Sequence, residues 1–220
     1  AALRGRNHDG HGFVPLAFEG GAGAAMVEAG YARPPGCGGP LLRVPDTLAG
    51  LRAAALGYRR DLGMEVVGVT GSAGKSTVKE MTVRTLSTVI PTAGTRGNWN
   101  NEIGVPLSIL SADRDAKAGV FEVGMNHPGE LAPLCALIGP RWGIVTNVGP
   151  AHFEFFAGSL EAIADEKAEL LRALPSGGVA VLCRDDAFFG KLAAASPGRV
   201  ITISMKDEAD YRFVGMSGGE

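Results

Sequence analysis

The sequence has little of what marks secreted or membrane-spanning proteins. Its three cysteines, Cys37, Cys135 and Cys183, form no CxxC pair and no metal-ligand spacing, so we expect buried thiols in a reducing compartment rather than disulfides or a cysteine zinc site. No uninterrupted apolar run approaches the roughly 18 residues of a membrane helix, and the amino end lacks a signal-peptide pattern. The sequence therefore predicts a cytoplasmic protein with no membrane partner.

An excess of charge of either sign is also missing. The 220 residues carry 21 lysines and arginines against 23 aspartates and glutamates. Because there is no basic excess, we expect no nucleic-acid partner. The hydrophobic content of 45% allows a real core in one large domain or one and a half ordinary ones. The first methionine is Met26 and the last residues are GMSGGE, so we interpret the chain as an internal piece of a longer protein, and we expect a monomer.

The most informative stretch is residues 66–77, VVGVTGSAGKST, an apolar run that breaks into a glycine loop at the start of a helical pattern. Such a turn leaves the first N–H groups of the helix pointing at one spot, which favours a phosphate. Gly71 and Gly74 permit close approach of the backbone, Lys75 can reach β and γ oxygens, and the Ser76 hydroxyl can ligate Mg²⁺. We therefore predict that ATP or GTP binds here. The loop residues expected to hold the nucleotide are Gly71, Ser72, Ala73, Gly74, Lys75, Ser76 and Thr77.

The match to the phosphate-loop motif is imperfect. The pattern GxxxxGK[ST] would need glycine at Val69, and Gly68 is one place out of register. The alternative is a glycine turn with a solvated lysine. Nucleotide binding is favoured because β-branched residues precede the loop and apolar residues follow it at helical spacing. The positions expected on the apolar face of that helix are Val78, Met81, Thr82, Thr85, Leu86 and Val89.

The first 62 residues are less regular. We expect a helical stretch after the opening glycine-rich loop, with its apolar positions at Val14, Ala17, Phe18, Ala25, Met26 and Ala29. Residues 41–44 could form a short strand, and residues 45–47 can begin a helix. His8 and His11 suggest a metal site, but solvation or a hydrogen bond to a ligand is the better interpretation because no third metal ligand lies nearby in the sequence.

Two polar features follow the glycine loop along the chain. Residues 95–106, TRGNWNNEIGVP, concentrate amide donors and acceptors, which suits a polar ligand but is also typical of an Asn/Gly turn. Glu122 lies near the carboxyl end of a buried-type strand at 118–123, where a carboxylate is costly unless it is paired, metal-bound or half-exposed. Since open parallel sheets bind ligands beyond the carboxyl ends of their strands, Glu122 is placed to complete a Mg²⁺ site with Ser76.

His152 falls just past the carboxyl end of a third strand, predicted at 142–148. A lone histidine is usually a hydrogen-bonded core or surface residue. Beside the neighbouring motifs, however, a second metal ligand becomes the better interpretation of His152.

Lys167 lies in the middle of an apolar stripe on a helix predicted at 159–174. The stripe consists of Leu160, Ile163, Ala164, Leu170, Leu171 and Leu174. Desolvation lowers the pKa of a lysine and raises its fraction of neutral amine. Such an amine could be carbamylated by CO₂ and become an anionic metal ligand. The alternative is a side chain whose stem is buried and whose amine extends to water.

Helix and strand signals alternate along the rest of the chain. A helical pattern runs through 131–137, strands are predicted at 178–183 and 200–204, and a helix is predicted at 188–195. This alternation indicates a parallel α/β sheet. The fold class we predict is α/β, with a parallel-sheet phosphate-loop domain preceded by part of a smaller α/β domain.

Five motifs in this order resemble the Mur ligase family. They are TGSAGKSTVKEM at 70–81, GNWNNEIGVPLSIL at 97–110, EVGMNHPGEL at 122–131, TNVGPAHFEFF at 146–156 and SLEAIADEKAELL from 159. The resemblance implies residues 1–62 as a partial N-terminal UDP-substrate-binding domain and residues 63–220 as the central ATP-binding domain, truncated at its carboxyl end. The C-terminal ligase domain of the family is absent, so we expect little or no ligase activity from this piece alone.

The resemblance implies an ATP-dependent ligase that joins D-alanyl-D-alanine to UDP-N-acetylmuramoyl-tripeptide through an acyl phosphate, in the cytoplasmic stage of peptidoglycan synthesis. Lys75 and the loop amides would hold the phosphates. The implied catalytic residues are Lys75, Glu122, His152 and Lys167. The implied metal ligands are Ser76 and Glu122 for one Mg²⁺, His152 for a second, and Lys167 if it is carbamylated. The residues implied to contact the muramoyl-peptide are Asn98, Asn100 and Asn101.

Several alternatives remain open on the sequence. One is another ATP-dependent amide ligase, either a different Mur step or an enzyme like folylpolyglutamate synthase. The GNWNNEIG loop argues against these. Another is a nucleotide-binding module without ligase chemistry, or a catalytically silent domain. A GTPase would want an NKxD base-reading motif, and the sequence contains none.

Overall fold

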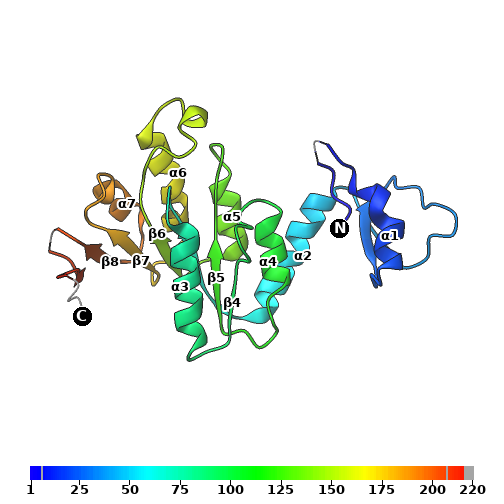
Figure 1. Cartoon of the computed structure of the whole chain (residues 1–220), viewed down its shortest axis with the longest axis horizontal. Helices are drawn as coiled ribbons and strands as arrows, with labels where there is room; N and C mark the ends of the chain where they lie inside the picture. Colours follow the sequence, from blue (N-terminus) through cyan, green and yellow to red (C-terminus); the bar gives the residue numbers. More distant parts are fainter. Residues whose placement is uncertain (6, 207, 216–220) are drawn as a thin grey trace, which may run out of the picture. The chain divides into compact units, whose positions relative to one another are not determined.

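The computed structural model describes residues 1–5, 7–206 and 208–215, and the chain divides into two compact units, Ala1–Gly57 and Tyr58–Glu220. The boundary between the units falls inside one helix, α2 (Thr47–Leu62). Figure 1 shows both units in the colours of the sequence. None of the helices in the described ranges is both long and apolar enough to cross a bilayer.

The first unit is built on a small parallel sheet. Its elements are η1 (Gly10–Phe13), α1 (Val14–Glu19), β1 (Ala25–Glu28), β2 (Leu41–Val44) and the first part of α2. The strands pair in parallel, with Ala25 opposite Leu41. The strand predicted at 41–44 and the helix start at 45–47 are confirmed, because the Asp46 carboxylate accepts the N–H of Ala49 at 2.6 Å as α2 begins.

The helical stretch predicted through Ala29 is wrong in its second half. Helix α1 ends at Glu19, and Gly21, with φ of +89°, turns the chain away. Residues 25–28 then form β1, in which Ala25 and Val27 are buried on one face. Those apolar residues follow the two-residue period of a strand, which the sequence pattern did not separate from a helical one.

His11 holds the loop of the first unit together. Its Nδ1 lies 2.6 Å from the Asp9 carboxylate, and its Nε2 accepts the N–H of Glu28 at 2.9 Å. Both ring nitrogens are therefore used within the protein, which fits a structural histidine rather than a metal ligand. His8 is exposed on the same loop.

The second unit is an α/β structure around a seven-stranded sheet. The strands are β3 (Glu65–Thr70), β4 (Thr92–Gly94), β5 (Ala118–Glu122), β6 (Trp142–Val145), β7 (Val179–Cys183), β8 (Arg199–Ser204) and β9 (Tyr211–Arg212). Their order is β4-β5-β3-β6-β7-β8-β9, and every neighbouring pair is parallel. The predicted α/β fold with a parallel sheet is confirmed.

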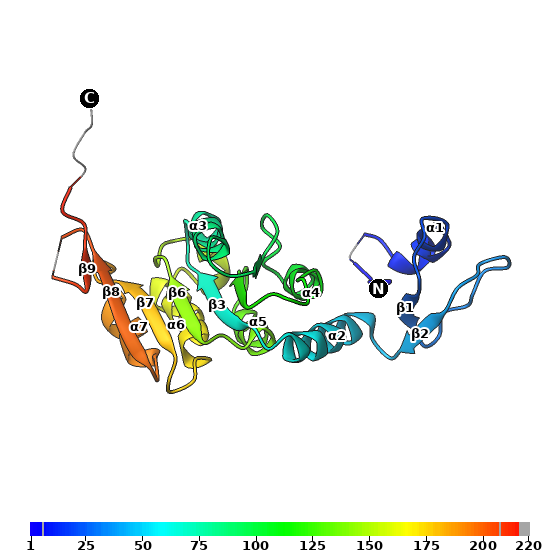
Figure 2. The ribbon, with the colours of Figure 1, turned by 90° about the horizontal axis from the view of Figure 1, so that it is seen from below.

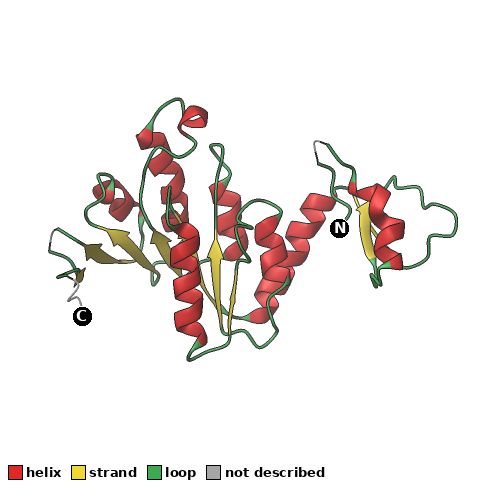
Figure 3. Ribbon diagram, in the orientation of Figure 1, coloured by secondary structure: helices red, strands yellow, loops and turns green. Residues whose placement is uncertain are grey.

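Helices cover both faces of this sheet, as Figures 2 and 3 show. They are α3 (Lys75–Ser87), α4 (Gly104–Leu110), α5 (Leu131–Ile138), α6 (Leu160–Arg172) and α7 (Phe189–Ala195), with the short η2 (Phe153–Phe156) before α6. Helix α3 lies on one face, and α5 and α6 lie on the other (Figure 2). Strand β3 has β5 on one side and β6 on the other, so the order of the strands reverses beside it. The crevice beyond the carboxyl ends of these strands is where open α/β sheets bind ligands.

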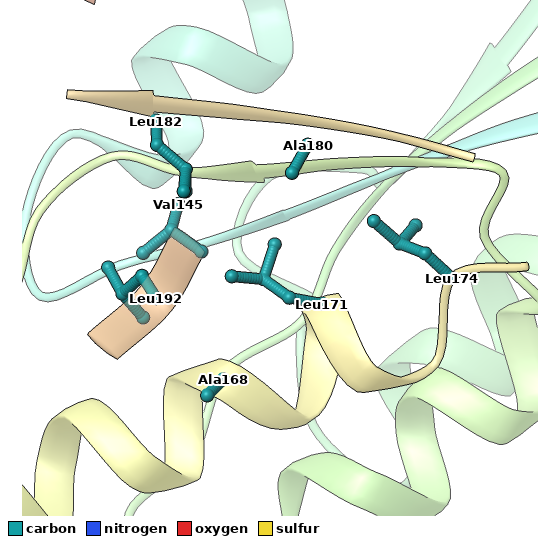
Figure 4. Close-up of a cluster of buried hydrophobic side chains, with 7 residues drawn as sticks. All are labelled: Val145, Ala168, Leu171, Leu174, Ala180, Leu182 and Leu192. Atoms are coloured by element: carbon teal, nitrogen blue, oxygen red, sulfur yellow. The ribbon is translucent and has the colours of Figure 1, made fainter. Parts of the chain in front are cut away.

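Part of the core lies between the strands β6 and β7 and the helices α6 and α7. Figure 4 shows Leu171 of α6 and Leu174, just after this helix, pointing at the sheet, with Leu192 of α7 in the same cluster. Cys135 is buried in α5 as predicted, but Cys37 and Cys183 are only half-buried, so the prediction of buried thiols is wrong for those two.

The apolar face predicted for α3 is only partly right. Val78 and Leu86 are half-buried, but Met81 is 64% exposed and Val89 76% exposed. The only fully buried side chain of α3 is Lys79. The buried stripe of this helix therefore passes through a lysine, which a pattern of apolar residues could not reveal.

Candidate functional site

The glycine loop joins the end of β3 to the start of α3. Gly74 is the residue before α3 and has a φ of +77°, and none of the side chains that the structure describes caps the free N–H groups of the first turn. Gly71 has a φ of +150°, and a Cβ there would lie 1.8 Å from the Thr146 hydroxyl oxygen. Both glycines are thus required by the backbone path, and the uncapped turn fits the phosphate of a nucleotide.

The segment after β6 holds the loop from the neighbouring strand. The Thr146 hydroxyl donates to the Ala73 carbonyl at 2.6 Å, and the Asn147 side chain accepts the N–H of Ala73 at 2.9 Å. The Ser72 hydroxyl and the backbone of Gly149 exchange hydrogen bonds of 2.8 Å. Thr146 and Asn147 were not predicted as site residues, although their place just after a central strand could have indicated them.

Lys75 lies over the glycine loop. Its Nζ donates to the carbonyl of Gly71 at 2.8 Å and lies 3.4 Å from that of Ser72. These neutral acceptors are weak partners for an ammonium group compared with phosphate oxygens. The amine is therefore placed where it can exchange them for a bound polyphosphate.

Ser76 and Glu122 come together as the sequence predicts. The Ser76 hydroxyl donates to Glu122 Oε2 at 2.7 Å, and the Asn100 amide donates to Glu122 Oε1 at 2.7 Å. Glu122 is 1% exposed, so the half-exposed alternative is wrong. Among the described residues no cationic side chain forms an ion pair with Glu122. A buried carboxylate beside a hydroxyl, without a cation of its own, fits the oxygen ligands that Mg²⁺ prefers.

The three predicted asparagines have different environments. The Asn101 side chain accepts the N–H groups of Ile103 and Gly104 at 3.2 and 2.8 Å, at the start of α4. Asn100 bonds to Glu122, as above, and Asn98 is exposed. The amide of Asn101 is thus engaged in holding the loop, whereas the side chain of Asn98 is open to a ligand.

His152 is not joined to the Ser76 and Glu122 pair. It is exposed, with a φ of +59°, just before η2. Within the described ranges it forms no hydrogen bond or ion pair with Ser76, Glu122 or Lys167, and no three His, Cys, Asp or Glu side chains gather into a metal site.

Lys167 is buried on α6, with 2% of its surface exposed. Burial lowers its pKa from 10.5 to about 8; the charge of Lys75 acts in the same direction and that of Glu166 opposes it. Glu166 itself accepts the N–H groups of Gly129 and Leu131 at 2.9 and 2.8 Å. The side chain does not extend to water, so the structure favours the desolvated amine.

The lowered pKa of Lys167 predicts a pH-dependent stability. Between pH 8 and 10.5 the unfolded chain holds a proton on Lys167 that the folded chain releases, so the contribution of Lys167 to the free energy of unfolding should rise with pH in that window. Burial raises the pKa of the Cys135 thiol, which opposes this rise in the upper part of the window, so the contribution of Lys167 is taken as the difference between the unaltered chain and Lys167→Met. The total gain should be roughly 3 kcal/mol. Urea unfolding at several pH values in bicarbonate-free buffer measures it. The variant Lys167→Met should lose the rise, and Lys117→Met, which removes an exposed lysine, should keep it. An equal rise in Lys167→Met would contradict the assignment.

Comparison with known proteins agrees with this geometry. The family model for the Mur ligase middle domain matches residues 69–217, so the chain belongs to the Mur ligase family. Within that family it is similar to MurF. It is 39% identical to the UDP-N-acetylmuramoyl-tripeptide--D-alanyl-D-alanine ligase of Bacillus subtilis over 84% of this chain and 40% of that protein.

Solved structures lead to the same relatives. MurF of Acinetobacter baumannii matches with a TM-score of 0.81 and 32% identity, covering 92% of this chain and 44% of that one. MurF of Thermotoga maritima, solved in complex with ADP, matches with a TM-score of 0.81 and 30% identity, covering 94% and 47%. The chain thus spans less than half the length of these relatives.

Proposed function

We propose that this chain is the ATP-binding part of a ligase that joins D-alanyl-D-alanine to UDP-N-acetylmuramoyl-tripeptide in peptidoglycan precursor synthesis. The observation that carries the proposal is the Ser76–Glu122 contact of 2.7 Å beside an uncapped glycine loop. This arrangement occurs in a chain similar to ligases named for that reaction. The ADP in a similar MurF structure supports a nucleotide at the loop.

The chemistry needs charge to be neutralised while a phosphoryl group moves. The terminal carboxylate of the tripeptide attacks the γ-phosphorus of ATP, so a C–O–P linkage forms as ADP leaves. The amine of D-alanyl-D-alanine then attacks the acyl carbon, and phosphate leaves as the amide forms. Lys75 and the first N–H groups of α3 would hold the phosphate oxygens in place, where positioning and electrostatics dominate the rate.

Metal ions and a modified lysine complete the proposal. Ser76 and Glu122 would hold Mg²⁺, which when bound neutralises phosphate charge. His152 is proposed for a second metal ion, and Lys167, once carbamylated, would supply an anionic oxygen ligand there. The buried, partly neutral amine of Lys167 supports that modification. Asn98 is proposed to contact the muramoyl-peptide, with Asn100 and Asn101 shaping the same loop.

The same proposal assigns a role to each of the two domains expected in the chain. Residues 1–62 would belong to a UDP-substrate-binding domain and residues 63–220 to the ATP-binding domain, in a monomer that works in the cytoplasm. The relatives are more than twice as long as this chain. Their remaining length would supply the rest of the substrate sites.

The proposal is tested by phosphate release from ATP. The 220-residue chain should release little or no phosphate in response to D-alanyl-D-alanine. A longer chain that restores the regions found in relatives should release phosphate with UDP-N-acetylmuramoyl-tripeptide and D-alanyl-D-alanine, and should not do so with folate and glutamate. Turnover with the folate pair instead would replace this function by that of another amide ligase.

A further inference from the structure

Lys79 is a buried cation that the proposed chemistry does not use. It lies one turn after Lys75 on α3, and its side chain is completely buried. Its Nζ donates to the carbonyls of Thr95 at 2.8 Å and Gly97 at 3.1 Å, and to the Glu80 carboxylate at 2.6 Å. Burying a charged amine is costly unless it is fully hydrogen-bonded, and here all three N–H bonds have acceptors.

The carbonyls that Lys79 binds belong to the segment that carries the proposed substrate contacts. This segment, residues 95–101, follows β4 and is called here the asparagine loop. Its backbone is also bonded to β5 and the residues after it, through the Thr95 N–H to the Val120 carbonyl at 3.1 Å and the Gly124 N–H to the Asn100 carbonyl at 2.8 Å. Two further attachments lead to Glu122. The Thr95 hydroxyl accepts the N–H of Glu122 at 2.9 Å, and Asn100 donates to the Glu122 carboxylate.

The asparagine loop is therefore attached to the nucleotide site at two points. One is Lys79, on the same helix as Ser76. The other is Glu122, whose second oxygen accepts the Ser76 hydroxyl. A nucleotide that binds at Ser76 and the first turn of α3 therefore acts on both attachments of the asparagine loop, at Lys79 and at Glu122. Trp99, which is 43% exposed, lies in the loop between Gly97, which accepts from Lys79, and Asn100, which donates to Glu122.

We propose that Lys79 is a positioning residue that links nucleotide binding to the order of the asparagine loop. The inference rests on the proposed nucleotide site and adds to it. It predicts that a Mg²⁺–nucleotide bound at α3 makes residues 95–101 more rigid, and so prepares the loop for the muramoyl-peptide before that substrate arrives. Without the Lys79 amine, the loop keeps its attachments to Val120, Glu122 and Gly124 but loses its link to α3, so it responds less to the nucleotide.

Tryptophan fluorescence can report on this loop. The chain has two tryptophans, so Trp142→Phe leaves Trp99 as the only one. In that background, acrylamide quenching of Trp99 is measured with and without MgADP. We expect MgADP to lower the quenching constant about twofold, since an ordered loop opens less often. Lys79→Met should remove most of this change while its Kd for MgADP stays within about threefold. Lys117→Met, the same change at an exposed lysine, should behave as the reference.

The outcomes separate the two proposals. A full response of Trp99 in a folded Lys79→Met variant would overturn the role of Lys79, and so would MgADP binding that leaves Trp99 unchanged in the reference. No MgADP binding in the reference would overturn the nucleotide site and this inference together. If Lys79→Met does not fold, hydrogen exchange of the unaltered chain decides: MgADP must slow exchange of residues 95–101 and leave residues 30–40 of the first unit unchanged.

Discussion

Replacement of Lys75 by methionine should weaken MgATP binding about 100-fold. The amine now donates to the carbonyls of Gly71 and Ser72, and in the nucleotide complex it would donate to phosphate oxygens instead. A hydrogen bond to a charged group contributes roughly 1.5–3 kcal/mol, and each 1.4 kcal/mol or so is tenfold in affinity. Isothermal titration calorimetry of the chain with MgATP measures this change in Kd.

The fold should tolerate this replacement. Lys75 is only half-buried and the methionine keeps most of the stem, so the free energy of unfolding should change by less than about 1 kcal/mol. Lys117→Met serves as the matched control and should bind MgATP normally. The pKa of Lys167 should also rise, because the charge of Lys75 is one of the causes that lower it. Binding of MgATP by Lys75→Met within about threefold of the reference would refute the assignment of the loop.

The sequence was most informative where one physical rule relates distant residues. Ser76 and Glu122 lie 46 residues apart, yet the prediction that they meet is confirmed because carboxyl ends of parallel strands share one edge of a sheet. Lys167 could be found because a charged residue stands alone in an apolar stripe. In both cases the surroundings of the residue follow from a periodic pattern.

Other parts of the site could not be predicted in this way. Lys79 looks like an ordinary polar helix position, and its burial depends on carbonyls of a loop that has no periodic pattern. Asn101 looks like a ligand contact, but its side chain accepts the N–H groups of Ile103 and Gly104, because α4 begins three residues later. Strand β1 was missed because four residues are too few to separate a strand period from a helical one.

The second large effect should come from a single methyl group at Gly71. A Cβ at this position would lie 1.8 Å from Thr146 Oγ1 and 3.2 Å from the Asn147 nitrogen, and the φ of +150° disfavours any side chain. Overpacking and backbone strain each cost roughly 1–3 kcal/mol. Gly71→Ala should therefore destabilise the second unit by about 3 kcal/mol and lower its Tm by about 6–12 °C in a thermal melt. Nucleotide binding should be lost as well, because Thr146 and Asn147 hold the loop in shape.

A double-mutant cycle separates the clash from the strain. Thr146→Ala removes the oxygen that the new methyl would meet, but leaves the Thr146 Cβ at 3.1 Å and the φ of residue 71 unchanged. If the clash dominates, Gly71→Ala should cost clearly less in the Thr146→Ala background than alone. If the backbone strain dominates, the two costs should be equal. Gly177→Ala, which has open space around its Cβ, should melt like the reference. If Gly71→Ala melts like Gly177→Ala, the loop can move aside freely. The close fit of Gly71 against Thr146 would then not determine the shape of the nucleotide site.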